Sequence, residues 1–159
     1  MAKAFEFSVN GKAVSIAPNS EEAPLLDILR NELGLMGTRF GCGVEQCGCC
    51  MVLIDGAPEK SCAKPVWSVA GKTITTVEGL GSTERPHPLQ RAFLDEQAGQ
   101  CGYCLSGILI SAKALLDRNP QPTRQQIAAA LDGNICRCGS HNRILRAVEK
   151  AAAQMRGAP

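Results

Sequence analysis

Cysteine is the residue type that most constrains this chain. Four of its nine cysteines fall within nine residues, in the stretch CGVEQCGCC from Cys42 to Cys50. Because the total is odd, the cysteines cannot all pair with one another as disulfides. The N-terminal stretch lacks the apolar run of a secretory signal, so we expect a cytoplasmic protein, unless a partner carries it to a membrane or out of the cell. In such a compartment, clustered thiols more commonly bind metal than form disulfides.

The bulk composition argues against several classes of function. The formal net charge of +2 is balanced and no block of lysine or arginine occurs, so no nucleic-acid partner is expected. No stretch approaches the roughly 20 apolar residues of a membrane span. The two histidines, His87 and His141, lie in no catalytic arrangement, and neither GxGxxG nor a P-loop occurs. We therefore expect no catalytic residue in this chain.

The first group of cysteines has the spacing of a plant-type 2Fe–2S ferredoxin. Cys42, Cys47 and Cys50 form C-x4-C-x2-C, and such a cluster takes a fourth thiolate from further along the chain. Cys62 is the only candidate for it in this half of the sequence. Glycines crowd the same region, and glycine lets the backbone come close to a ligand. Cys49 is left over, and we expect a small, partly buried residue there rather than a ligand.

The second group comprises Cys101, Cys104, Cys136 and Cys138. Its pattern is C-x2-C, then 31 residues, then C-x-C. These cysteines lie beside the ends of predicted helices, and helix N-termini favour bound negative charge. Four cysteines also bind zinc well, so the residues alone leave that alternative open. A C-x-C pair inside a helical domain is an unusual zinc spacing, however, and the pattern favours a second cluster.

The first half of the chain is predicted to mix strands and helix. Two apolar runs flank Asn10-Gly11, which indicates a tight hairpin with two apolar cross-strand pairs, Phe7–Val14 and Phe5–Ile16. A helix is expected over residues 24–33 because its apolar residues recur at helical spacing. Strands are expected in MVLIDG and KTITTVEG. We therefore expect the first half to form a small sheet with one helix packed on it.

The second half is predicted to be almost wholly helical. Apolar periodicity indicates helices over residues 88–98, 105–118 and 141–155, and Thr123 with Gln126 forms a capping box for one more. A stretch rich in Gly, Ser and Pro, residues 79–88, joins the halves. We therefore expect an α+β fold with two domains, residues 1–80 and 81–159, the second a compact bundle of helices.

These motifs together resemble one known family. The chain is similar to the small iron–sulfur subunit of the molybdenum hydroxylases, the xanthine oxidase family, through GCGVEQCGCC, SCAKPV, TTVEGL, QCGYC and NICRCG in that order. Within it, the chain resembles the small subunits of nicotinate dehydrogenase and isoquinoline 1-oxidoreductase through HPLQRAFLDEQ, ALLDRNP and RCGSHNRILRAV. Cys49 departs from the alanine that is usual in both.

The resemblance implies a fold, cofactors and partners. The fold is an N-terminal plant-type ferredoxin-like β-grasp domain followed by a C-terminal four-helix bundle, each holding one 2Fe–2S cluster. The main partner is a large subunit that carries a molybdopterin cofactor, while this chain passes electrons to an acceptor, either a flavin subunit or cytochrome c. Gln100 and Cys138 match the family positions that contact the pterin.

The resembled branch implies an N-heteroaromatic substrate such as nicotinate. Three alternatives stay open from the sequence: the same role in an aldehyde oxidoreductase, a free-standing ferredoxin-like carrier, and a zinc-stabilised interaction module. The helical half favours a subunit over a free carrier, because a simple carrier needs only the first half.

Overall fold

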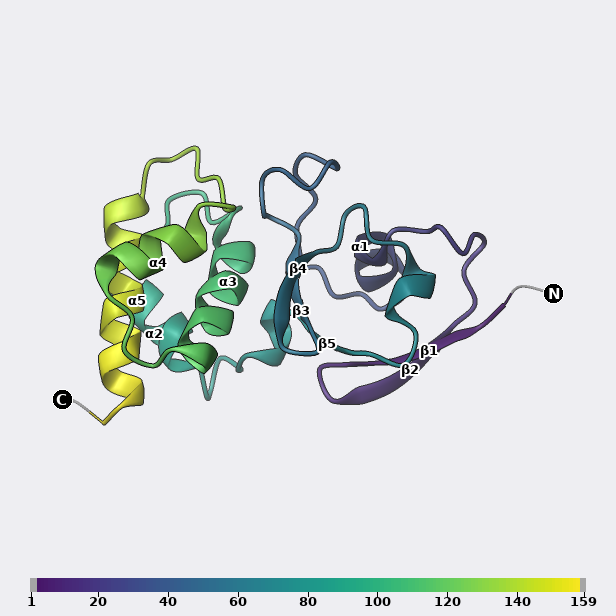
Figure 1. Ribbon diagram of the computed structural model, residues 1–159, viewed down its shortest axis with the longest axis horizontal. Helices are drawn as coiled ribbons and strands as arrows, with labels where there is room; N and C mark the ends of the chain where they lie inside the picture. The colour runs from purple at the N-terminus through teal and green to yellow at the C-terminus, as the bar shows by residue number, and fades with distance from the viewer. Residues whose placement is uncertain (1–2, 158–159) are drawn as a thin grey trace.

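The computed structural model describes residues 3–157. A five-stranded sheet with a short helix forms the N-terminal part, and four helices follow it, which confirms the expected α+β architecture. The two parts lie side by side along the long axis of the molecule, and α3 (Leu105–Arg118) packs on the sheet where they meet (Figure 1). The domain boundary at residue 80 stays a prediction.

The hairpin at the start of the chain has the predicted register. β1 (Phe5–Val9) and β2 (Lys12–Ile16) are antiparallel, with two facing apolar pairs, Phe7–Val14 and Phe5–Ile16. Asn10 and Gly11 both have positive φ, as a two-residue loop of this kind requires. The Asn-Gly pair therefore determines which side chains of the hairpin face the core.

The rest of the sheet has the order β2-β1-β5-β3-β4. β1 is parallel to β5 (Thr73–Thr75), whereas β3 (Met51–Ile54) is antiparallel both to β5 and to β4 (Ala57–Lys60). The sequence does not predict β4, which contains Pro58. Proline is tolerated there because β4 lies at the edge of the sheet.

The helix predicted over residues 24–33 has two parts. It begins as α1 (Leu25–Asp27) and continues as the wider π-helical turn Ile28–Glu32. Leu33 accordingly donates its backbone N–H to the carbonyl of Ile28, five residues back. The apolar stripe of this helix packs on one face of the sheet and forms the core of the N-terminal domain with Val52, Ile54 and Ile74.

Strand β3 is buried on both faces, which explains its unbroken apolar sequence MVLI. Val52 and Ile54 point into the N-terminal core. Met51 and Leu53 point to the opposite face and pack against Ile110 and Ala114 of α3. Helix α3 is thereby enclosed between the sheet and the other helices, so its buried surface is wider than the single stripe that periodicity predicts.

The helical domain consists of α2 (Pro88–Asp95), α3, α4 (Arg124–Leu131) and α5 (His141–Met155). Both short helices begin with a capping box. The Nδ1 atom of His87 accepts the backbone N–H of Leu89, and the predicted Thr123 and Gln126 pair caps α4. His87 is therefore a helix-capping residue in this structure.

Two details at helix ends differ from the sequence prediction. α2 ends at Asp95 rather than near Ala98, because Gln97 adopts the left-handed conformation and Ala98 bonds back to Phe93. Met155, the last residue of α5, continues the apolar stripe of that helix in the sequence, yet it is 40% exposed.

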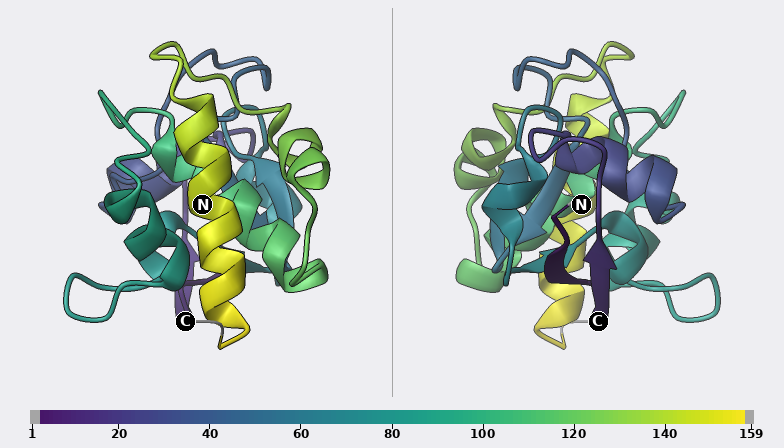
Figure 2. Two further views of the ribbon diagram at one scale, coloured as in Figure 1. Left: turned by 90° about the vertical axis from the view of Figure 1, so that its left-hand side faces the viewer. Right: turned by 90° about the vertical axis from the view of Figure 1, so that its right-hand side faces the viewer.

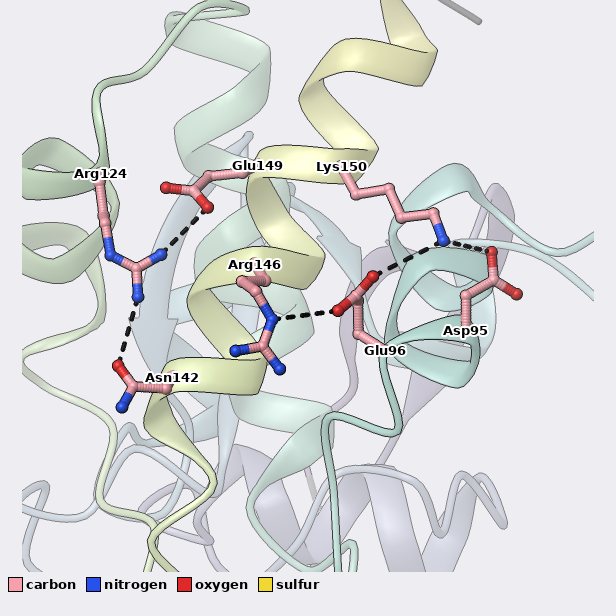
Figure 3. A network of polar contacts seen from close by, with 7 residues as sticks. All are labelled: Asp95, Glu96, Arg124, Asn142, Arg146, Glu149 and Lys150. Carbon is pink, nitrogen blue, oxygen red and sulfur yellow. Dashed lines mark hydrogen bonds and ion pairs between the residues drawn. The ribbon is translucent and has the colours of Figure 1, made fainter.

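A network of ion pairs fastens α5 to its neighbours (Figure 3). Lys150 contacts both Asp95 and Glu96 at the end of α2, at 3.1 and 3.7 Å. Arg146 contacts Glu96 at 3.2 Å, and on the other side Glu149 accepts a 3.0 Å bond from Arg124 of α4. These partly exposed pairs supplement the apolar contact between α2 and α5.

The cysteine-bearing loops gather along one side of the molecule. The loop between α1 and β3, the loop before α3 and the loop before α5 all lie at the top in Figures 1 and 2. In residues 3–157, no helix combines the length and apolar character that crossing a membrane requires.

Candidate metal centres

The first cysteine group is built on the loop that leads into β3. Cys42 and Cys47 lie on the loop, Cys50 lies at its end, and Cys62 follows β4. Cys50 and Cys62 are buried together beneath Leu26. The Sγ atom of Cys42 accepts three backbone N–H bonds of 3.2–3.4 Å, from Val44, Gln46 and Cys47. The loop thus encloses sulfur with main-chain donors.

Glycine makes this enclosure possible. Gly43 has φ +71°, a conformation that side-chain-bearing residues rarely adopt. At Gly41, a Cβ atom would lie 2.5 Å from Cys47 Sγ, so no larger residue fits there without displacing the sulfur. The glycines of this loop therefore leave space for thiol groups and for what they bind.

The thiols of the first group differ in acidity. The three N–H bonds lower the pKa of the Cys42 thiol to about 6. Burial raises the pKa of the Cys62 thiol to about 11. Metal ligands must be thiolates. The Cys42 thiol is therefore largely deprotonated at neutral pH before metal binds, whereas the buried Cys62 thiol gives up its proton when metal binds. This donor set fits an iron–sulfur cluster.

The second cysteine group joins two helix N-termini. Cys101 and Cys104 precede α3, and Cys136 and Cys138 precede α5. The Sγ atoms of Cys101 and Cys138 lie 3.4 Å apart without a disulfide bond. Cys104 and Cys136 are buried in the bundle core, whereas Cys101 is exposed. All four thiols predicted to form this group are therefore brought to the same end of the bundle.

Main-chain donors also surround the second group. The backbone N–H of Tyr103 lowers the pKa of the Cys101 thiol. Burial raises the pKa of Cys136, but hydrogen bonds from the Ser140 N–H, the Cys104 thiol and the N–H groups of Cys138 and Gly139 together outweigh it, and the net shift is downward. Burial raises the pKa of Cys104 to about 12. As in the first group, exposed and buried thiols lie side by side.

Gln100 lies beside this group, as its position in the sequence predicts. It is exposed, and its Nε2 atom donates a 3.2 Å hydrogen bond to the carbonyl of Cys138. The two residues proposed from the resemblance to face a pterin are thus joined to each other at the surface, next to the exposed Cys101.

Cys49 lies where the two groups approach each other. Its side chain is 7% exposed and belongs to the same apolar cluster as Cys104 and Cys136. Burial raises the pKa of its thiol to about 12, so the group stays neutral. The expected small, buried residue is observed, but its position between the groups is a tertiary feature that the sequence does not indicate.

The sequence also does not indicate the contacts that join the two groups. Asn134 is buried, and its Nδ2 atom donates a 3.2 Å bond to the carbonyl of Gly48. Gly48 lies against Gly107 of α3 so closely that a Cβ atom at Gly107 would overlap its carbonyl. Gly107 follows the C-x2-C motif by three residues, and the only sequence signal for this contact is a glycine within a predicted helix.

Among residues 3–157, no three His, Cys, Asp or Glu side chains are arranged to hold one metal ion. A structural zinc site needs four ligands around one point, whereas a di-iron cluster takes two thiolates on each of two irons.

Two protein families match the chain, one on each half. The family described as the 2Fe-2S iron-sulfur cluster binding domain matches residues 7–73, and the family described as the 2Fe-2S binding domain matches residues 76–149. The chain therefore contains two 2Fe–2S binding domains, and zinc is not the metal that these families bind.

Two relatives match nearly the whole chain. One component of the nicotinate dehydrogenase of Pseudomonas putida is 51% identical over 98% of this chain and 99% of its own length. The alpha chain of isoquinoline 1-oxidoreductase from Brevundimonas diminuta is 48% identical over 94% of this chain and 97% of its own length.

Solved structures share the fold. The aldehyde oxidoreductase of Desulfovibrio desulfuricans superposes with a TM-score of 0.94 and 39% identity over 98% of this chain, which corresponds to 17% of that longer chain. A chain of quinoline 2-oxidoreductase from Pseudomonas putida superposes with a TM-score of 0.87 and 37% identity, and the match covers 99% of this chain and 98% of that one. The protein therefore belongs to the family of small 2Fe–2S electron-transfer subunits of the molybdenum hydroxylases.

Proposed function

We propose that the eight grouped cysteines hold two 2Fe–2S clusters. Cys42, Cys47, Cys50 and Cys62 are the ligands of the first, and Cys101, Cys104, Cys136 and Cys138 are the ligands of the second. A bound cluster of this type takes up and releases one electron at a time. The N–H groups directed at the sulfurs, such as those around Cys42, stabilise the added negative charge and raise the reduction potential.

Electrons enter through the second group. The observation that supports this direction is the bond between Gln100 and Cys138, which places an amide and a ligand candidate together at the surface beside the exposed Cys101. A large subunit that carries molybdopterin docks on this face. The Gln100 side chain, fixed by the Cys138 carbonyl, then lies between the pterin and the second group.

Electrons leave through the first group. Its loop exposes Phe40, Val44 and Glu45, and Cys42 on the same loop is only half-buried. The acceptor, a flavin subunit or cytochrome c, belongs to another chain and docks there. We assign the first cluster to a domain of residues 1–80 and the second to a domain of residues 81–159, the bounds that the sequence suggests.

The substrate of the complex is an N-heteroaromatic compound such as nicotinate. The relatives named for nicotinate dehydrogenase and isoquinoline 1-oxidoreductase support this choice, since they are 51% and 48% identical over almost the entire chain. The aldehyde oxidoreductase structure is 39% identical, which makes an aldehyde the second candidate. The substrate pocket lies on the large subunit, so this chain carries no direct specificity contact of its own.

The test is to supply each substrate to the purified complex anaerobically. The proposal predicts that nicotinate bleaches the visible absorption of the clusters within the turnover time, whereas an aromatic aldehyde does so much more slowly. Rapid bleaching by the aldehyde alone would reassign the substrate class. Recovery of this chain as a stable holoprotein without any large subunit would instead indicate a free electron carrier.

A further inference from the structure

Tyr103, the only tyrosine in the chain, connects the two cysteine groups. It lies within the C-x2-C pair of the second group, between Cys101 and Cys104. Its hydroxyl nevertheless donates a hydrogen bond to the carbonyl of Phe40, on the loop of the first group. A residue of one metal-binding motif therefore contacts the loop of the other, across 63 positions of sequence.

Two more contacts fix the orientation of Tyr103. The guanidinium group of Arg39 lies 5.3 Å from the centre of its ring, within the range of a cation–π contact. Its backbone N–H bonds the sulfur of Cys101. Tyr103 is thus attached to the second group through its main chain and to the first group through its side chain.

The Tyr103 hydroxyl anchors the N-terminal part of the loop, residues 39–46, to the helical domain. The C-terminal end of the loop is fixed to the helical domain twice, by the bond from Ile135 to Cys47 and by the bond from Asn134 to Gly48. Within residues 3–157, no other hydrogen bond joins residues 39–46 to the helical domain. This segment also carries the N–H donors that surround Cys42.

We propose that Tyr103 is a positioning residue that holds the loop of residues 39–46 against the second cysteine group. The hydroxyl keeps the loop closed over Cys42 and keeps its N–H donors directed at the sulfur. Loss of the hydroxyl therefore disturbs the first cluster, although Tyr103 belongs to the motif of the second. This inference rests on the proposed function, because it requires a cluster in each group.

The test compares two conservative substitutions in the purified complex. Tyr103→Phe removes the hydroxyl and keeps the ring beneath Arg39. The matched control, Trp67→Phe, removes an exposed aromatic donor, the 3.1 Å bond to Glu22, outside the cysteine loops. Three measurements are made: the paramagnetic resonance spectrum of the reduced clusters, the rate of iron release to a chelator, and hydrogen exchange of the peptide that covers residues 39–46.

We expect Tyr103→Phe to broaden one cluster signal, that of the first group, and to leave the other unchanged. The signal of the first group is identified as the one that Cys62→Ser abolishes. Iron release from this cluster should accelerate about fivefold, which corresponds to the net loss of one ordinary hydrogen bond. Hydrogen exchange in residues 39–46 should accelerate as well, while Trp67→Phe behaves as the wild type.

Two results overturn the inference, and they are distinguishable. If wild-type protein shows two signals and Tyr103→Phe changes neither the first signal nor its iron release, the hydroxyl does not position the loop. The same conclusion follows if only the signal of the second group changes. If wild-type protein carries fewer than two clusters, the proposed function fails, and this inference fails with it.

Discussion

The backbone N–H of Ile135 donates a hydrogen bond to the carbonyl of Cys47 across 2.9 Å. The bond joins the segment before α5 to the loop before β3, and the neighbouring Asn134 adds a second bond to Gly48. The two cysteine groups are therefore held together by direct contacts between their own loops. Because these contacts lie at the cysteines, movement of the linker between the domains does not change the separation of the groups.

Gly107→Ala is expected to destabilise the protein where α3 meets the first cysteine loop. Alanine favours helix by about 1 kcal/mol over glycine. Its Cβ atom, however, would overlap the backbone carbonyl of Gly48, which cannot rotate away. The overlap should outweigh the gain and lower the free energy of unfolding by about 1–3 kcal/mol, measured by thermal or chemical denaturation.

Gly133→Ala is the matched control for that substitution. A Cβ atom at Gly133 meets nothing within 4 Å, and its φ does not lie in the left-handed region. It should leave the stability unchanged or slightly increased. If Gly107→Ala were as stable as this control, the close contact between α3 and the cysteine loop would not exist in solution.

Cys49→Ala should leave the iron content of the protein unchanged. Cys49 lies outside both ligand spacings, C-x4-C-x2-C with Cys62 and C-x2-C with C-x-C, so it is not one of the eight thiolates that the two clusters need. Removal of its sulfur leaves a small cavity, and we expect a loss of about 1 kcal/mol in stability. Iron analysis and visible absorption are the measurements, with Cys50→Ala as the variant that loses a cluster. Loss of iron from Cys49→Ala would show that it is a ligand.

Gln100→Ala should slow electron entry without affecting the clusters. The substitution removes the amide that bonds Cys138 and is proposed to face the pterin. Stopped-flow reduction of the complex by substrate should therefore be slower, while iron content and the potentials measured with a chemical reductant stay the same. Gln125→Ala, at an exposed position on α4, is the control. Equal reduction rates for the two variants would remove Gln100 from the electron path.

The contribution of Lys150 to stability should depend on pH. A bond from Lys150 lowers the pKa of Asp95 in the folded protein below its ordinary value of 3.8. The stabilisation is therefore fully present above that ordinary value and is lost as the pH falls through the lower folded value. Lys150→Ala should lower the melting temperature at pH 7, and the difference from wild type should shrink below about pH 4.

The salt dependence of the ion pairs in Figure 3 provides a second check on that prediction. Because they are partly exposed, the effect of Lys150→Ala at pH 7 should also diminish as the salt concentration rises. A melting difference that is the same at pH 3 and pH 7 would mean that Lys150 acts through the packing of its aliphatic chain and not through Asp95.

Much of the fold could be predicted because short-range signals determine it. The Asn10-Gly11 turn fixes the hairpin register, and apolar periodicity together with the capping pair Thr123 and Gln126 predicts where the helices lie. The π turn after Asp27 and the early end of α2 could not be predicted. Each depends on the backbone conformation of a few residues, which apolar periodicity does not indicate. The second buried face of α3 requires the sheet to be in place.

The candidate site likewise has features that local sequence signals predict and features that they do not. The spacing of the cysteines assigns them to two groups, because ligand spacing reflects the local loop that binds the cluster. The contacts between the groups involve Tyr103, Asn134 and Ile135, which no local pattern singles out. They arise only when the two domains dock, so a sequence read in separate motifs does not reveal them.

The most direct test of this account is a metal count combined with a redox titration followed by paramagnetic resonance on the purified protein. The account predicts four irons per chain, no stoichiometric zinc, and two distinct signals that each titrate as one-electron couples. Two irons per chain, a single signal, or zinc bound at the Cys101–Cys138 group would contradict it.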